Sequence, residues 1–151
     1  MAWLLNIFRK WWQRRVERRL LKCLESEVAE EFLKLLLKLM SLAFKIDEDF
    51  RRNITGFTGR YQFRSVDNSI TVAALFTGKG LKVKEGLIPD ADVSLIFKDG
   101  KSLMSYLLAT DRDILRLLLN NEAVLKGNVN YIFKFAYMAN HLQLALTGRL
   151  P

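Results

Sequence analysis

The sequence predicts an α+β fold: a five-stranded, mostly antiparallel sheet with helices packed on one face. Three observations lead to this prediction. Residues 56–88 alternate apolar and polar side chains with a period of two, which is typical of strands. Residues 93–97 repeat that alternation later in the chain. Residues 24–46 and 129–142 instead carry apolar side chains at the spacing of a helix.

The period-two stretch divides into three strands joined by two short turns. Asp67-Asn68 and Thr77-Gly78-Lys79-Gly80 have turn composition, so an antiparallel meander is expected. One face of this meander is apolar and aromatic, and the other is polar and basic, as in a sheet with one wet face. The apolar face is expected to carry Phe57, Tyr61, Phe63, Ile70, Val72, Ala74, Phe76, Leu81, Val83 and Leu87.

The last third of the chain predicts the order strand, helix, short helix, strand, helix. Asp99-Gly100 ends the strand at 93–97, and residues 102–108 have helical spacing. Asp111 is a suitable N-cap for the next helix. A short strand over 122–128 ends in a Gly127-Asn128 turn, and the final helix follows from residue 129.

The helix predicted over residues 24–46 is apolar around most of its circumference. Its polar side chains occupy only about a third of the helical wheel. The rest must be covered by another helix, a bound lipid or a second chain. Lysines within it argue against a transmembrane span, and the apolar face is too wide for a coiled-coil seam. The polar stripe consists of Glu27, Glu30, Glu31, Lys34, Lys38, Ser41 and Lys45.

The net charge of +8 in this 151-residue chain is concentrated at the N-terminus. Residues 1–23 hold seven Lys or Arg against one Glu, whereas residues 24–151 hold seventeen against fifteen. We therefore expect two parts: a basic amphipathic helix over 1–23 and one domain over 24–151. Because that domain is nearly balanced in charge, a nucleic-acid binder is not favoured.

The N-terminal segment predicts a helix that lies on an anionic membrane or docks on a partner. Its apolar run is too short to span a bilayer, because Arg9 and Lys10 interrupt it. Tryptophan favours the headgroup boundary, and basic side chains are attracted to anionic lipids. The residues expected to bind the membrane are Trp3, Leu4, Ile7, Phe8, Trp11, Trp12, Arg14, Arg15, Arg18 and Arg19.

No constellation of catalytic residues stands out, so we expect no enzyme activity, no cofactor and no metal site. One cysteine, Cys23, and one histidine, His141, provide neither a disulfide nor a Cys/His metal site. His141 falls on the polar side of the last helix and is expected to be a surface or rim residue. The glycines at 78 and 80 lack the spacing of a phosphate-binding loop.

The informative signal is an excess of Met, Leu, Phe and Ala in the helices. Such a mixture suits an adaptable wall around an acyl or isoprenoid chain. The same residues equally suit a closed core, and the residues alone leave both interpretations open.

Four segments together resemble the sterol carrier protein two family of lipid-binding domains. They are Ala91-Asp92-Val93, the helix at 102–108, the turn Val124-Leu125-Lys126-Gly127-Asn128, and the helix at 129–142. Val124 stands where the family has Leu. The resemblance covers roughly residues 25 to 145. The N-terminal helix is similar instead to a membrane-associated bacterial branch of accessory lipid-binding factors, including factors of quinone biosynthesis.

The resemblance implies a lipid tunnel between sheet and helices, covered by the C-terminal helix. It implies non-enzymatic binding, transfer or presentation of a fatty acyl, phospholipid, sterol-like or quinone ligand by a cytoplasmic protein on the inner face of a membrane. The rival interpretation is an accessory subunit whose apolar helices assemble with protein partners as a homo- or hetero-oligomer. The implied lining consists of Phe97, Met104, Leu107, Leu108, Leu115, Leu119, Ile132, Phe135, Ala136 and Ala139.

Overall fold

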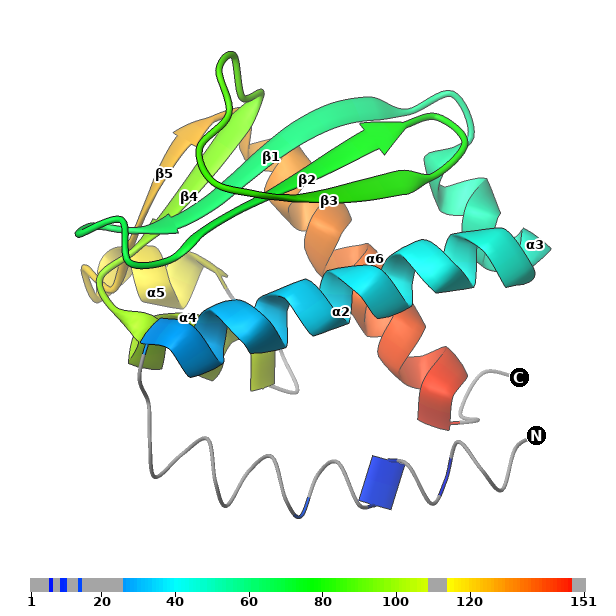
Figure 1. Ribbon diagram of the computed structural model, residues 1–151, viewed down its shortest axis with the longest axis horizontal. Helices are drawn as coiled ribbons and strands as arrows, with labels where there is room; N and C mark the ends of the chain where they lie inside the picture. The colour runs from blue at the N-terminus through cyan, green and yellow to red at the C-terminus, as the bar shows by residue number, and fades with distance from the viewer. Residues whose placement is uncertain (1–5, 7–8, 11–13, 15–25, 109–113, 148–151) are drawn as a thin grey trace.

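The structure, a computed structural model, describes residues 6, 9, 10, 14, 26–108 and 114–147, with side chains as far as 144. Helices cover one face of a five-stranded sheet (Figure 1). The long helix α2 (Ser26–Ile46) and the C-terminal helix α6 (Val129–Thr147) cross beneath the sheet, and α4 (Gly100–Leu108) and α5 (Ile114–Leu119) lie beneath one end. The predicted two-layer α+β architecture is confirmed.

The sheet is mixed, with three antiparallel pairs and one parallel pair. Its strands are β1 (Thr58–Ser65), β2 (Thr71–Thr77), β3 (Leu81–Glu85), β4 (Val93–Phe97) and β5 (Ala123–Gly127), in the order β3-β2-β1-β4-β5. The central strands β1 and β4 pair in parallel, and all their other neighbours are antiparallel. The prediction of a mostly antiparallel sheet is therefore correct.

A parallel pair requires a crossover, and here the loop over residues 86–92 provides it. Gln62, on the outer face of β1, fixes this loop on the sheet. Its amide nitrogen donates to the Gly86 carbonyl at 3.2 Å, and its amide oxygen accepts from the Ile88 N–H at 2.8 Å. The expectation that Leu87 continues the third strand was wrong. The chain leaves β3 at Gly86, which has a φ of +91°, and Leu87 is 57% exposed on the crossover.

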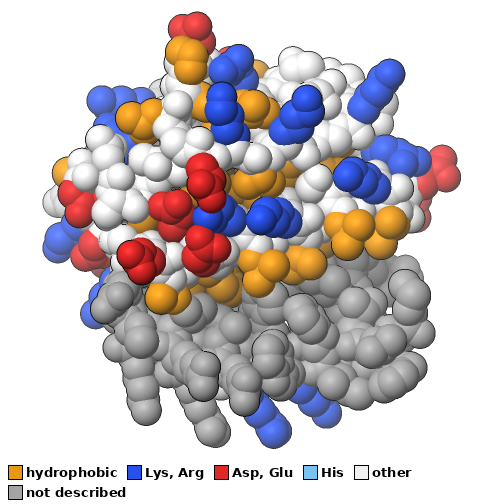
Figure 2. All heavy atoms as spheres, viewed as in Figure 1, with side chains coloured by type: hydrophobic (Ala, Val, Ile, Leu, Met, Phe, Trp, Pro, Cys, Tyr) orange, Lys and Arg blue, Asp and Glu red, His pale blue; other side chains and the backbone are white. Residues whose placement is uncertain are grey.

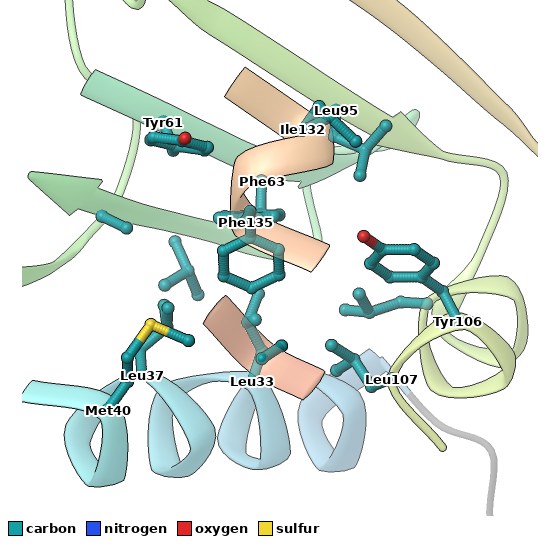
Figure 3. Packing of buried hydrophobic residues seen from close by; sticks show 14 of the residues in the cluster. Leu33, Leu37, Met40, Tyr61, Phe63, Leu95, Tyr106, Leu107, Ile132 and Phe135 are labelled. Atoms are coloured by element: carbon teal, nitrogen blue, oxygen red, sulfur yellow. The ribbon is translucent and has the colours of Figure 1, made fainter. Parts of the chain in front are cut away.

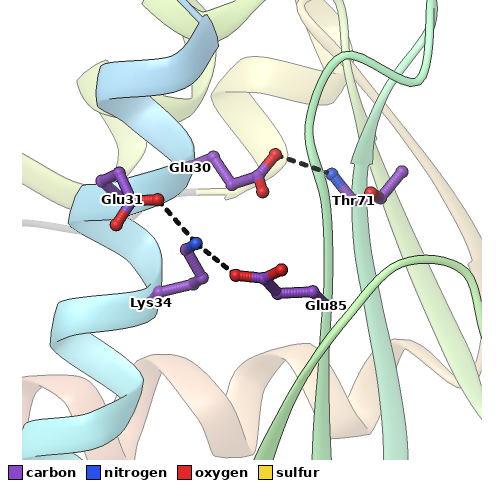
Figure 4. Close-up of polar contacts among 5 residues, drawn as sticks. All are labelled: Glu30, Glu31, Lys34, Thr71 and Glu85. Atoms are coloured by element: carbon purple, nitrogen blue, oxygen red, sulfur yellow. Dashed lines mark hydrogen bonds and ion pairs between the residues drawn. The ribbon is translucent and has the colours of Figure 1, made fainter.

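Polar contacts attach α2 to the edge strand β3 and to the start of the neighbouring strand β2. Lys34 Nζ lies 2.6 Å from Glu85 Oε1 and 2.6 Å from Glu31 Oε1, and Glu30 Oε2 accepts from the Thr71 N–H at 3.3 Å (Figure 4). Ser41 Oγ donates to the Leu81 carbonyl at 2.8 Å. Part of the polar stripe of α2 thus faces the sheet edge, and it shields a strand edge that would otherwise invite pairing.

Residues 47–54, which connect α2 to the first strand, form two short helices. Asp47 caps α3 (Glu48–Arg51) by accepting from the Asp49 and Phe50 N–H groups, and η1 (Arg52–Ile54) follows. Phe50 stacks on Phe44 of α2 at a centroid distance of 4.6 Å, and Ile54 is fully buried. Two apolar residues four positions apart, together with an Asp cap, explain why this segment is ordered against α2.

The Ala91-Asp92-Val93 segment and the Gly127-Asn128 turn meet at one point of the fold. The Asp92 carboxylate accepts from the Arg60 N–H at 2.8 Å, and the Asp92 carbonyl accepts from the Asn128 N–H at 3.2 Å. Gly127 has a φ of +101°, and a Cβ there would meet the Asp92 carbonyl and lie 2.9 Å from Val93 Cα. Only glycine fits this junction, after which the Asn128 side chain accepts from the Asn130 N–H at the start of α6.

Candidate functional site

The candidate site is the apolar interior between the inner face of the sheet and the helices. Side chains from five elements point into it (Figure 3). Strands β1 and β4 contribute from one side, and α2, α4 and α6 contribute from the other. All of the side chains labelled in that view are buried: Leu33, Leu37, Met40, Tyr61, Phe63, Leu95, Tyr106, Leu107, Ile132 and Phe135.

Aromatic rings form the centre of this interior. Phe63 and Phe135 have centroids 5.1 Å apart, and Tyr61 lies 5.1 Å from Phe76 and 5.8 Å from Tyr131. Alternation along β1 and β2 explains the sheet's share of these rings, because every second side chain faces the helices. Ring pairs at such distances add attraction beyond their burial, so these contacts stabilise the sheet side of the interior.

The Tyr61 hydroxyl is a polar group at the edge of this aromatic cluster. It donates to the Tyr131 carbonyl of α6 at 2.6 Å, which ties the sheet to the helix. Burial raises the pKa of Tyr61 well above its usual value, and the nearby Tyr131, Tyr106 and Asp92 add to this effect. The hydroxyl therefore stays protonated, and the interior carries no charge at this position.

Six of the ten residues implied as lipid lining lie together in the buried cluster. They are Phe97, Met104, Leu107, Ile132, Phe135 and Ala139. Leu108 and Ala136 are half-buried, at the margin of the same interior.

The inward placement expected for Leu115 and Leu119 was wrong. Leu115 is 51% exposed and Leu119 is 82% exposed, whereas Ile114 and Leu117 face the core. With leucine at four of its positions, a six-residue helix does not reveal from sequence which side faces inward.

Sequence reasoning omitted several residues that contribute to the interior. The inward rings of β1 and β2, Tyr61, Phe63 and Phe76, were predicted on the apolar face but not as part of the site. The same holds for the α2 side chains, because an apolar helix does not specify what it covers. The omitted α2 residues that are buried in the cluster are Ala29, Phe32, Leu33, Leu37, Met40 and Phe44.

His141 lies half-buried on α6, where it contacts α3 and η1. Its Nδ1 is 2.9 Å from Asn53 Nδ2, and its ring lies 5.2 Å from Phe50 in an edge contact. This agrees with the rim position expected for it. Nearby on α6, Lys134 places its ammonium 4.3 Å from the centroid of Phe57. Both side chains join α6 to neighbouring elements.

The predicted membrane-binding segment lies almost entirely outside the described residues. Arg14 is described, and its side chain is exposed. The other expected contacts lie outside the described positions: Trp3, Leu4, Ile7, Phe8, Trp11, Trp12, Arg15, Arg18 and Arg19. Among the helices that the structure describes, none combines the length and apolarity needed to cross a bilayer.

One buried cation joins two elements by an ion pair, between Lys34 of α2 and Glu85 of β3. Lys34 has 11% of its side chain accessible, and hydrogen bonds to Glu31 and Glu85 raise its pKa. The same contact lowers the pKa of Glu85. Within residues 26–108 and 114–144, no three His, Cys, Asp or Glu side chains are grouped so that they could hold a metal ion.

Among solved structures, the chain is similar to one described as the UbiJ-SCP2 ubiquinone synthesis protein. The identity is 16% and the TM-score 0.56, over 78% of this chain and 93% of that one. A stereoselective inverting sec-alkylsulfatase, Pisa1 from Pseudomonas sp., matches at 16% identity and a TM-score of 0.50. That match covers 58% of this chain but only 14% of the sulfatase, so it concerns a small part of that enzyme.

The sterol carrier protein domain 2 of Helicoverpa armigera also matches, at 15% identity and a TM-score of 0.49, over 78% of this chain and 89% of that domain. No protein-family model matches the sequence, and no curated protein matches it either. The structural likeness shows that the chain has a sterol carrier protein 2-like fold, as the sequence motifs predicted.

Proposed function

We propose that this protein binds a single hydrophobic lipid between the inner face of the sheet and helices α2, α4 and α6, and transfers or presents it without catalysing a reaction. The observation that carries the proposal is the apolar interior itself. Six implied lining residues lie there together: Phe97 of β4 extends the aromatic face of β1 and β2, and the other five, from α4 and α6, lie across from that face. The sterol carrier protein 2-like fold supports the same role.

The interior suits a flexible hydrocarbon chain better than a polar ligand. Burying each CH₂ group of an acyl or isoprenoid chain contributes about 0.8 kcal/mol. Met40 of α2 and Met104 of α4, which lie on neighbouring helices, are adaptable side chains that can re-pack around such a ligand. The candidate ligands are fatty acyl chains, phospholipids, sterol-like molecules and isoprenoid quinones. The name of the UbiJ-SCP2 neighbour, a ubiquinone synthesis protein, makes a quinone the first ligand to test.

The N-terminal segment is proposed to hold the protein on the inner, cytoplasmic face of a membrane. Its three tryptophans and seven basic residues favour an anionic headgroup layer. Attachment there would keep the lipid-binding domain close to its ligand and raise the effective ligand concentration.

Uptake of a fluorescent fatty acid and of a quinone analogue, together with native mass spectrometry, tests lipid binding. Ala136→Phe places a ring at the half-buried margin of the interior and is expected to reduce uptake strongly. The matched control is Asn130→Phe, which adds the same ring at an exposed position of α6. Uptake that is absent in the unmodified protein, or equal in the two variants, would refute the proposal.

A second candidate function, assembly with a protein partner, is favoured by apolar side chains that remain exposed on α2. Leu35, Leu42 and Ile46 lie at spacings of seven and four residues, so they share one side of the helix. Leu42→Glu, in a sizing experiment, distinguishes the two functions. If assembly is the main role, the substitution should convert an oligomer into monomers. If lipid binding is the main role, lipid uptake should be unchanged.

A further inference from the structure

The outer face of the sheet, which faces away from the lipid-binding interior, is basic. The strand register places Arg60 and Arg64 of β1, Lys82 and Lys84 of β3, and Lys126 of β5 on this side, since each alternates with an inward residue. We call these five residues the basic outer face. Figure 2 shows Lys and Arg side chains spread over the strand region, with a group of acidic side chains nearer α2.

The cations of the basic outer face are not neutralised by their neighbours. Within the described part of the chain, ion pairs involve Lys34 and Arg52, and none involves these five residues. The crossover loop itself carries two carboxylates, Asp90 and Asp92, and Asp92 already accepts from the Arg60 N–H. Glu85 points to the opposite side, toward Lys34. The face therefore keeps an excess of positive charge.

The crossover loop adds an apolar ridge between these cations. Gln62 binds the loop over the centre of the sheet, where Ala73 is fully buried beneath it. Leu87 projects from the loop, with Lys84 on one side along β3 and Lys126 across the sheet on β5. In Figure 1 the loop stands at the top of the molecule, on the side opposite the helices. An exposed aliphatic side chain flanked by cations suits the boundary of an anionic bilayer.

The residue types on this face favour lipid headgroups over other anionic partners. The aromatic side chains of the strands, Tyr61, Phe63, Phe76 and Phe97, are buried on the other face, so bases have no ring on which to stack. Three of the five cations are lysines, which protein–protein interfaces tend to lack. Lysine acts as a hydrated point charge, which is sufficient for attraction to a headgroup layer.

We propose that the basic outer face, with Leu87 at its centre, docks on anionic phospholipid headgroups and orients the domain on the membrane. It shares with the proposed function only the premise that the protein works at an anionic membrane. It requires no lipid in the interior.

The test is binding of the full chain to vesicles of phosphatidylglycerol and phosphatidylcholine, at low and at high salt. Lys84→Gln/Lys126→Gln removes one cation on each side of the crossover loop and is expected to weaken binding about 30-fold at low salt, since each contributes roughly a factor of five. The matched control, Lys45→Gln/Lys101→Gln, removes two exposed cations from α2 and α4 and should weaken binding less than about threefold.

A second pair of variants tests the apolar ridge. Leu87→Ser should weaken vesicle binding, whereas Leu42→Ser, at a similarly exposed leucine of α2, should not. Equal losses in the two lysine variants, or no loss in either, would overturn the proposal. So would normal vesicle binding by the Lys84/Lys126 variant combined with lost binding to a single-stranded oligonucleotide.

The same lysine variant separates this inference from the proposed function. Uptake of a fluorescent fatty acid from solution, without vesicles, should be unchanged in Lys84→Gln/Lys126→Gln. A protein that binds vesicles through this face but takes up no lipid would contradict the proposed function alone.

Discussion

The two faces of the sheet come from the same strands yet have opposite surroundings. On β1, Tyr61 and Phe63 pack against the helices, whereas Arg60 and Arg64 face outward. Gln62, also outward, is buried only because the crossover loop covers it. One set of strands thus supports an apolar compartment and a basic surface, and substitutions on the two sides should have separable effects.

The largest expected effect on stability comes from removing an aromatic ring from the inner face of the sheet. Phe63→Ala removes a buried ring that contacts Tyr61 and Phe135, and should lower the free energy of unfolding by about 3–5 kcal/mol. Arg60→Ala, on the outer face of the same strand, should change it by less than about 0.5 kcal/mol. Urea denaturation gives the free energy of unfolding of both variants. Similar losses in the two variants would show that the interior is not tightly packed.

The junction that joins both faces to α6 should be nearly as sensitive. Gly127→Ala adds a Cβ that meets the Asp92 carbonyl in a backbone conformation that disfavours side chains, and should cost about 3 kcal/mol or more. Gly86→Ala is the control, because its φ of +91° is equally unusual but no atom lies within 4 Å of the added Cβ. The difference between the melting temperatures of the two variants measures the effect of the steric clash alone. Equal melting temperatures would show that the clash at Gly127 has no effect on stability.

The Tyr61 hydroxyl should contribute a smaller, pH-dependent part of stability. Tyr61→Phe leaves the Tyr131 carbonyl without this donor and should cost about 1–2 kcal/mol at neutral pH. Because folding raises the pKa of Tyr61, its contribution is complete below the unfolded pKa, near 10, and declines as the pH rises above that value. The free energy of unfolding, measured from neutral to alkaline pH, should therefore decline less steeply in Tyr61→Phe than in the unmodified protein. Parallel curves would contradict this.

The smallest expected effect belongs to the contact between α2 and the sheet edge. Lys34→Met should lower stability by less than about 1 kcal/mol, because the two glutamates that it contacts are largely exposed. Lys34 lowers the pKa of Glu85, so this part of stability is present above the usual glutamate pKa and is lost as the pH falls below about 4. The free energies of unfolding of the two proteins, measured at decreasing pH, should therefore become equal below about pH 4. A difference that persists at low pH would exclude this mechanism.

Much of the fold could be predicted from the sequence because its periods are unambiguous. Alternation fixed which side chains of β1 and β2 face inward, and helical spacing located α2, α4 and α6. The segment 47–54 and the position of Leu87 could not be predicted, because both depend on long-range contacts. Phe50 packs against His141 of α6, and the crossover loop needs Gln62 as its partner.

The candidate site was predictable in part for the same reason. Phe97, Ile132 and Phe135 lie on elements with clear periods, and each is buried where expected. Leu115 and Leu119 are on a helix of six residues, where the inward side is set by packing against β5 and α4 rather than by pattern. The basic face of the sheet was visible in the alternation, but the ridge at Leu87 was not, because the crossover that raises it is a tertiary feature.

The parallel pairing of β1 with β4 also has a kinetic consequence. The hairpins β1–β2 and β2–β3 join neighbouring segments and can close early, whereas β4 can reach β1 only after the whole meander has been spanned. We therefore expect β4 and β5 to join late in folding and the hydrophobic compartment, which needs both halves, to be completed last. In a chain emerging during synthesis, the part of the aromatic strand face that α6 covers would stay exposed until that helix arrives, although α2 is made before the strands.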